Sequence, residues 1–117
     1  MTILKNVIED LLNNRQLTAD EAVDRHFAPS FRQRTNGSWD DRATFLTRIA
    51  GLREVVKHAT IAVLDEFVDD DRYAERHIVD LVKHDGERIV QEVYVFAKRN
   101  PDGRFTRIEE TTLALKQ

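Results

Sequence analysis

The sequence contains no cysteine, and it has only two prolines and four glycines among its 117 residues. Disulfide bonds, thiolate metal sites and cysteine nucleophiles are therefore excluded, and we expect a cytoplasmic protein because such a chain suits a reducing compartment. Long hydrophobic runs are missing too, since Glu9 and Asp10 interrupt the first apolar segment. We therefore expect neither a signal peptide nor a membrane partner.

Charge of one sign is not concentrated in any segment. The 18 basic residues are scattered along the chain and stand against 21 acidic residues, which gives a net charge of -3. Proteins that bind nucleic acid usually gather basic residues on one face or segment. We therefore expect no nucleic-acid partner.

Motifs for metals and cofactors are also missing. The chain has no glycine-rich phosphate loop, dinucleotide fingerprint or serine elbow. His26, His58 and His84 belong to separate predicted elements without the spacing of paired ligands, and the acidic turn 69–71 lacks the glutamate of a calcium loop. We expect no metal and no cofactor.

The first half of the chain predicts three helices and a short strand within a single domain, 1–117. Apolar residues recur at helical spacing up to about residue 14, and Thr18 with Glu21 forms a capping box that predicts a helix from 19 to about 27. A strand follows and turns at Asn36-Gly37. A third helix comes next, with Ser38 or Asp40 as its cap and an apolar stripe that includes Phe45, Ile49, Leu52 and Val56.

From residue 57 to about 115 the hydrophobic residues alternate with a period of two, and β-branched and aromatic residues are enriched. Turn signals at 69–71, 85–86 and 100–103 divide this segment into four strands of an antiparallel meander. Helices followed by a meander predict an α+β fold, in which a strongly curved antiparallel sheet wraps around the N-terminal helices.

The turns also predict a register. A two-residue loop at Asp85-Gly86 places His77 opposite Tyr94, and a one-residue bulge at Gly103 then places Tyr94 opposite Glu110. These three side chains form a polar row across three strands. The same face is predicted to carry Glu75, Glu92, Phe96 and Ile108, and the opposite face Ile78, Val93 and Val95.

This polar row has two interpretations. In the first, a carboxylate orients the imidazole of His77, which moves a proton on a bound ligand, so that His77, Tyr94 and Glu110 are catalytic candidates. In the second, the row is hydrogen-bonded within itself, and fixes strand register or lines a nonreactive pocket. A buried polar group without a partner costs about 1–3 kcal/mol, so the row needs internal bonds, solvent or a ligand.

The order of elements and three local strings resemble the nuclear transport factor 2-like superfamily, and within it the SnoaL-like group. The strings are HFAPSFRQRTNGSWDDRATFLTRIAGLRE, ERHIVDL with HDGERI after it, and DGRFTRIEETTLAL. The resemblance covers nearly the whole chain. It implies a cone-shaped, cystatin-like fold with a pocket between sheet and helices, where His77 and Glu110 point inward and Gln33 lies near the mouth.

The resemblance also implies a function class. The pocket would bind a small hydrophobic or amphipathic molecule, with isomerase, cyclase or hydrolase chemistry as the catalytic version, and the outer sheet face would support a homodimer. The alternative is a noncatalytic dimeric binding or interaction module. Arg34 stands where a histidine often follows the glutamine in similar sequences, so we assign no role to such a histidine here.

The ligand-binding candidates combine the polar row with apolar neighbours. They are Gln33, Trp39, Phe45, Ile49, Glu75, Glu92, Phe96 and Ile108. Trp39 either covers the pocket mouth or packs at the start of the third helix. Asp40 and Asp41 are interpreted as caps of that helix, because its N-terminal amides favour carboxylates.

Overall fold

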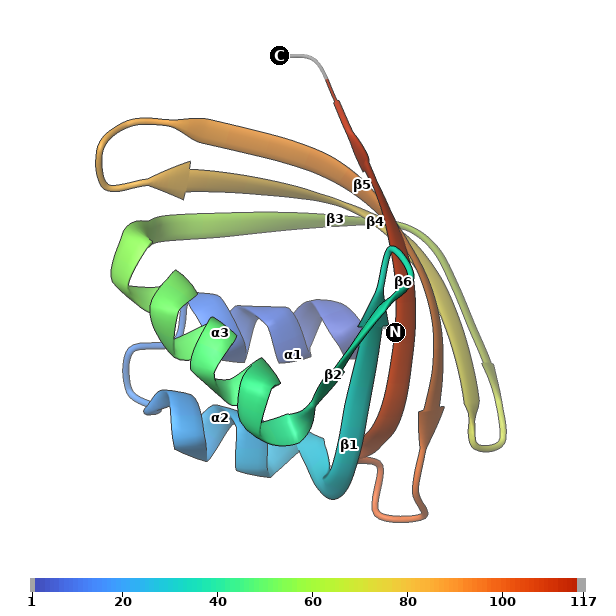
Figure 1. The fold of residues 1–117 in the computed structure, drawn as a ribbon. Helices are drawn as coiled ribbons and strands as arrows, with labels where there is room; N and C mark the ends of the chain where they lie inside the picture. Colours follow the sequence, from blue (N-terminus) through green and yellow to red (C-terminus); the bar gives the residue numbers. More distant parts are fainter. Residues whose placement is uncertain (1, 116–117) are drawn as a thin grey trace.

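The computed structural model describes residues 2–115 (Figure 1). Its elements in chain order are α1 (Ile3–Leu12), α2 (Ala19–His26), β1 (Phe27–Thr35), β2 (Ser38–Asp41), α3 (Arg42–Val55), β3 (Val56–Asp69), β4 (Arg72–Lys83), β5 (Arg88–Arg99) and β6 (Phe105–Ala114). The three predicted helices and the strands predicted after them are confirmed, and β2 is an additional strand that the sequence did not predict.

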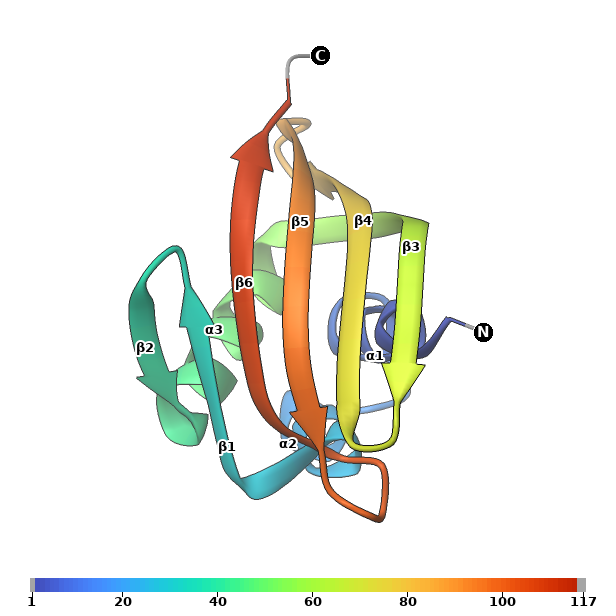
Figure 2. The ribbon, with the colours of Figure 1, turned by 90° about the vertical axis from the view of Figure 1, so that its right-hand side faces the viewer.

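One strongly bent sheet wraps around the three helices. Its strand order is β2-β1-β6-β5-β4-β3, and β3 to β6 form the predicted antiparallel meander. The helices lie on the concave side, while the convex side has no helix over it (Figures 1 and 2). Strand β1 pairs with β6 in parallel. The sequence pattern did not indicate this pairing, because the two strands are far apart in the chain and the whole segment between them forms the crossover connection.

The caps of two helices follow from short polar contacts. Thr18 and Glu21 form the predicted capping box, in which each side chain accepts the other's backbone N–H. At the start of α3 the predicted cap Asp41 is confirmed, because its Oδ1 accepts the Thr44 N–H at 2.8 Å. The other two predicted caps, Ser38 and Asp40, do not cap α3, because the helix begins at Arg42 and the position directly before it is Asp41.

Aromatic side chains hold α3 against the sheet. Phe27 and Phe31 of β1 have ring centroids 4.5 Å apart, and Phe45 of α3 lies 4.9 and 5.0 Å from them. Tyr73 and Phe105 extend this cluster across β4 and β6. All five are buried, and such centroid distances are typical of favourable aromatic pairs.

Strands β4 and β5 are joined by a three-residue loop, residues 84–86. The Lys83 N–H donates to the Glu87 carbonyl at 2.8 Å, and the Gly86 N–H donates to the Lys83 carbonyl at 3.0 Å. Gly86 has φ +91°, the left-handed conformation that closes this kind of loop. The predicted two-residue loop is therefore wrong by one residue.

That one residue changes which side chains share a face. His77 lies opposite Val93 instead of Tyr94, and a register shift near the β5–β6 turn places Glu110 opposite Val95. Because side chains alternate along a strand, Val93 and Val95 point inward with His77 and Glu110, and Tyr94 points outward. The predicted row through Tyr94 and the predicted outer position of the two valines are wrong.

Strand β3 forms one edge of the sheet, and a side chain of the helical layer is bonded to that edge. Asn13, just after α1, donates from Nδ2 to the Ala59 carbonyl at 2.7 Å and accepts the Ala59 N–H on Oδ1 at 2.8 Å. The amide thus takes the two hydrogen-bond positions that a neighbouring strand would use, and it fixes α1 to β3.

Candidate functional site

Polar side chains gather on the concave face of the sheet, where an apolar core would otherwise continue. They are Glu75 and His77 from β4, Glu110 from β6, and Gln33 and Thr35 from β1. The strand register places Glu75, Glu110 and Thr35 in one row across the sheet. We call these five residues the polar cluster.

Glu75 and His77 form a buried pair. His77 Nδ1 lies 2.7 Å from Glu75 Oε1, and the two residues are 3% and 4% exposed. Both point inward because residues two apart share one face of a strand. Within residues 2–115, His77 Nε2 has no hydrogen-bond partner. A carboxylate that holds one ring nitrogen while the other is free is the arrangement of a histidine general base.

Glu110 is the second acid–base group of the cluster. Its Oε1 accepts hydrogen bonds from Gln33 Nε2 at 2.7 Å and from Thr35 Oγ1 at 3.1 Å. Burial raises the pKa of Glu110, although the Thr35 hydrogen bond and the electrostatic interactions with His77 and Arg48 oppose that rise. A carboxyl group with a raised pKa keeps its proton to higher pH, and it can donate that proton to a ligand.

Two acceptor atoms of the cluster are buried without a donor. Among the described residues, no hydrogen bond reaches Gln33 Oε1 or Glu75 Oε2. Gln33 and Glu75 are 6% and 4% exposed, and neither of these two atoms is open to bulk water. An unpaired buried polar atom costs about 1–3 kcal/mol, and such exceptions in folded proteins often mark functional sites.

An ion pair between Arg48 of α3 and Asp40 of β2 lies next to the cluster. Asp40 is opposite Gln33 in the β1–β2 pairing and therefore shares its inward face. The charge of Arg48 also acts on Glu110. Our sequence reasoning missed Arg48, although its position three residues after Phe45 puts it on the inward stripe of the helix.

The apolar candidates belong to the core around the cluster. Phe45, Ile49 and Ile108 are 5%, 6% and 4% exposed, and Ile108 lies opposite Gln33. Partly buried Leu52, Val63 and Leu81 pack against the same core. The polar cluster therefore has apolar surroundings, while contact of these residues with a ligand stays a prediction.

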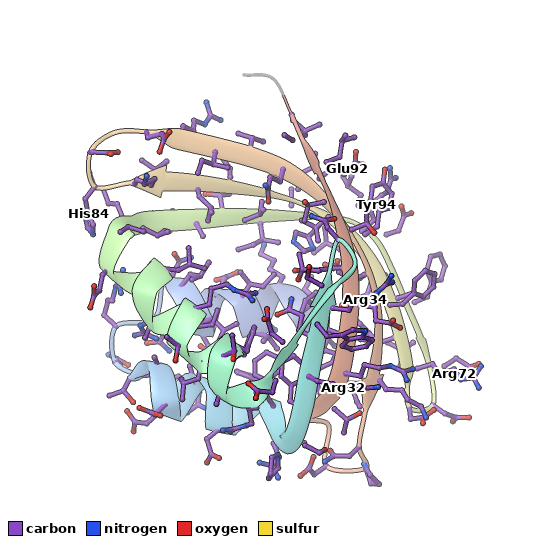
Figure 3. All side chains as sticks on the ribbon, in the orientation of Figure 1. Arg32, Arg34, Arg72, His84, Glu92 and Tyr94 are labelled. Atoms are coloured by element: carbon purple, nitrogen blue, oxygen red, sulfur yellow. The ribbon has the colours of Figure 1, made fainter. Side chains whose placement is uncertain are left out.

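Three predicted site residues lie on the other side of the sheet. Tyr94 and Glu92 project away from the helices (Figure 3), and Phe96 is 72% exposed on the same convex face. Glu92 accepts a hydrogen bond there from Arg76 at 3.0 Å. The assignment of these residues to the concave pocket is wrong, and the cause is the longer β4–β5 loop.

Trp39 also differs from its predicted position. It is 44% exposed and lies opposite Arg34 in the β1–β2 pairing, on the convex face of the sheet. The guanidinium of Arg32 lies 4.3 Å from the centroid of its ring, a cation–π contact. Trp39 therefore does not cover a pocket mouth on the concave face.

The convex face carries large exposed hydrophobic side chains. Phe67 and Phe96 are 67% and 72% exposed and stand on either side of the small Ala74, because the register aligns all three in one row. Two hollows adjoin these side chains, and Phe67, Ala74 and Phe96 are among the lining residues of both. Leu113, 53% exposed, adds to this surface.

Within residues 2–115, no three His, Asp or Glu side chains are grouped in a way that could hold a metal ion. The helices of this part of the chain are also too short or too polar to cross a membrane.

No protein-family model matches the sequence, and no curated protein sequence matches it. Solved structures match nearly the whole chain. An NTF2-like protein of unknown function from Exiguobacterium sp. 255-15 has a TM-score of 0.72 at 15% identity, over 99% of this chain and 100% of that chain. An LEH-like epoxide hydrolase from M. tuberculosis has a TM-score of 0.71 at 17% identity, over 96% and 84%. IdmH, a proposed polyketide cyclase from Streptomyces antibioticus, has a TM-score of 0.70 at 16% identity, over 96% and 88%.

The chain therefore has the fold of the nuclear transport factor 2-like superfamily. The predicted α+β class, with three helices and a curved open sheet, is confirmed. Identities of this size establish a shared fold, and a fold of this kind can host many different reactions. Function must therefore be argued from the polar cluster.

Proposed function

We propose that the protein is a SnoaL-like, cofactor-free enzyme that binds a small hydrophobic or amphipathic molecule on the concave face and moves a proton on it. The observation that carries this proposal is the buried Glu75–His77 pair close to Glu110. In the proposed step, His77 Nε2 takes a proton from the ligand and the neutral carboxyl of Glu110 donates one to a ligand oxygen. Isomerisation, cyclisation and hydrolysis are all compatible with such a pair.

The energetic cost of the polar cluster supports a functional role. A small domain gains stability from apolar side chains at inward positions, whereas two carboxyl groups, an imidazole and an amide must be desolvated there. Some of that cost is offset by hydrogen bonds to Glu75 and Glu110, but Gln33 Oε1 and Glu75 Oε2 stay unpaired among the described residues. A purely structural network would more commonly satisfy all of its members.

The fold neighbours favour the same class of chemistry. They include an LEH-like epoxide hydrolase and a proposed polyketide cyclase. At 16–17% identity this likeness supports a reaction class and no particular substrate. A cytoplasmic location stays a prediction from the absence of cysteine.

The proposal is tested with the ligand that co-purifies with the full chain. Native mass spectrometry identifies that molecule, which is then incubated with the protein in deuterated water while hydrogen–deuterium exchange is followed by mass spectrometry. The wild type should catalyse exchange, and His77→Ala and Glu110→Gln should slow it by about 100-fold or more, the usual effect of losing a general acid or base.

Glu92→Gln is the matched control, because Glu92 is an acidic residue of the same sheet on its convex face. It should exchange protons at the wild-type rate. Catalysis by the polar cluster would be rejected if His77→Ala and Glu110→Gln both exchanged as fast as this control.

A second candidate function is a dimeric interaction module that uses the convex face. Phe67 and Phe96 are large aromatic side chains that are exposed on this face, and both also line the two hollows there. A patch that offers both a projecting side chain and a hollow suits a two-fold interface, in which each surface meets its own copy. Acidic and basic side chains around one hollow, including Asp69, Arg72 and Glu109, offer complementary charges.

Light scattering at micromolar concentration tests the dimer. The wild type should have twice the mass of one chain, and Phe96→Glu should be a monomer because it buries a charge in the interface. Val55→Glu changes an exposed valine at the end of α3, away from the convex face, and should stay dimeric. A monomeric wild type would exclude this second function.

A further inference from the structure

The unpaired buried atoms of the polar cluster are of one kind. Gln33 Oε1 and Glu75 Oε2 are both acceptors, and no donor within residues 2–115 reaches them. From these two atoms we infer that the ligand is a neutral molecule with an apolar body and at least one hydroxyl or equivalent hydrogen-bond donor, and that it carries no carboxylate. This inference rests on the proposed function, because it names the chemistry of the molecule bound at the same site.

The orientation of the Gln33 amide is fixed by its neighbours. Glu110 Oε1 accepts a hydrogen bond from Gln33 Nε2 at 2.7 Å and another from Thr35 at 3.1 Å. Turning the amide over would set the Gln33 oxygen against this acceptor in place of a donor. Gln33 Oε1 is therefore the atom left over, and only a donor can satisfy it.

Glu75 offers an acceptor for a related reason. Its Oε1 is engaged by His77 Nδ1, while its Oε2 is buried and unpaired. A neutral His77 that donates from Nδ1 presents a lone pair on Nε2, which is a further acceptor on the same face. The concave face thus offers acceptors from both β1 and β4.

Charge around the cluster disfavours an anionic ligand. Three carboxyl groups, from Asp40, Glu75 and Glu110, face inward, and the basic partners are His77 and Arg48. Arg48 is already paired with Asp40 and His77 with Glu75. A carboxylate on the ligand would have to compete with Asp40 for Arg48, and it would meet the like charges of Asp40 and Glu75.

Three probes with the same apolar body test this inference: 2-naphthol, 2-methoxynaphthalene and 2-naphthoate. Each is titrated into the full chain labelled with nitrogen-15, and the Gln33 side-chain amide and the β4 backbone amides are followed by NMR. We expect 2-naphthol to bind at least about tenfold more tightly than its methyl ether, because only the naphthol donates a hydrogen bond. The naphthoate should bind most weakly.

Glu75→Gln should weaken this preference. The new side chain can still accept from His77 through its oxygen, but it places an amide donor where Oε2 was an acceptor. The advantage of 2-naphthol over the ether should fall by about tenfold, and 2-naphthoate should gain affinity. Glu92→Gln, the same substitution on the convex face, should leave all three affinities unchanged.

The outcomes separate this inference from the proposed function. Binding at the polar cluster with the ether or the naphthoate preferred over the naphthol would overturn the inference and leave the proposed function standing. No saturable binding of any probe, or shifts confined to convex residues such as Tyr94 and Phe96, would overturn the ligand site of both. An unchanged preference in Glu75→Gln would also overturn the inference.

Discussion

The carboxyl group of Glu110 is acted on by opposing influences. Burial favours its protonated form, while the hydrogen bond from Thr35 and the charges of His77 and Arg48 favour its ionised form. Asp40, which pairs with Arg48, and Gln33, which donates to Glu110, complete its surroundings. Burial prevails and the pKa of Glu110 is raised, so ionisation of this residue opposes folding.

Glu110→Gln should therefore change how stability depends on pH. Because the folded-state pKa lies above the ordinary 4.5, the folded protein binds this proton more tightly than the unfolded chain. The wild type loses stability as pH rises from 4.5 through the raised pKa, and the glutamine variant does not. Urea unfolding between about pH 4 and about pH 8 should show the variant gaining stability relative to the wild type across that window.

A variant without a titrating group provides the control. Thr112 lies opposite Val93, in the row next to Glu110, and Thr112→Val should alter stability by an amount that is the same at every pH. If the difference between Glu110→Gln and the wild type were equally independent of pH, Glu110 would not have a raised pKa.

At the scale of elements, the β4–β5 loop decides which face carries which side chains. The dipeptide Asp85-Gly86 correctly indicates a hairpin, but two-residue and three-residue hairpin loops both use a glycine with positive φ. The sequence alone therefore does not choose between them. Glu75, His77 and Glu110 still point inward in the structure, whereas Tyr94 and Phe96 moved to the opposite face.

Two glycines offer opposite outcomes for the same substitution. Gly86→Ala should destabilise the protein by about 1–2 kcal/mol, because a side chain disfavours the left-handed conformation at φ +91°. Gly51→Ala should stabilise it by up to about 1 kcal/mol, because Gly51 lies within α3 and an added Cβ would have no atom within 4 Å.

Urea denaturation at neutral pH measures both free energies of unfolding. A neutral Gly86→Ala would mean that the loop adopts another conformation, which would contradict the three-residue loop that places His77 opposite Val93. A destabilising Gly51→Ala would mean that α3 packs more tightly at this position than the structure shows.

At the scale of the whole molecule, the sequence pattern was sufficient for the helices and the meander, because each depends on neighbours close in the chain. The polar cluster could be predicted only in part. Gln33 and Glu110 meet across 77 positions through the parallel pairing of β1 with β6, and Asp40 meets Arg48 only once β2 has joined the sheet. Such contacts depend on the crossover geometry, which local periodicity does not contain.

If the convex face forms the proposed dimer, folding and assembly are coupled. The thermal unfolding midpoint of the wild type should then rise with protein concentration, because association stabilises the folded chain by mass action. The midpoint of Phe96→Glu should stay constant over the same range. Calorimetry at several concentrations measures both, and a wild-type midpoint that does not change would contradict the dimer.

The contact of Asn13 with Ala59 has a consequence for how molecules can stack. An exposed edge strand such as β3 can accept a strand from another molecule, and repetition of that step produces filaments. Asn13 occupies both hydrogen-bond positions of Ala59, so an added strand would have to displace this side chain to extend past residue 59. A single amide thus opposes strand addition at this position of the edge.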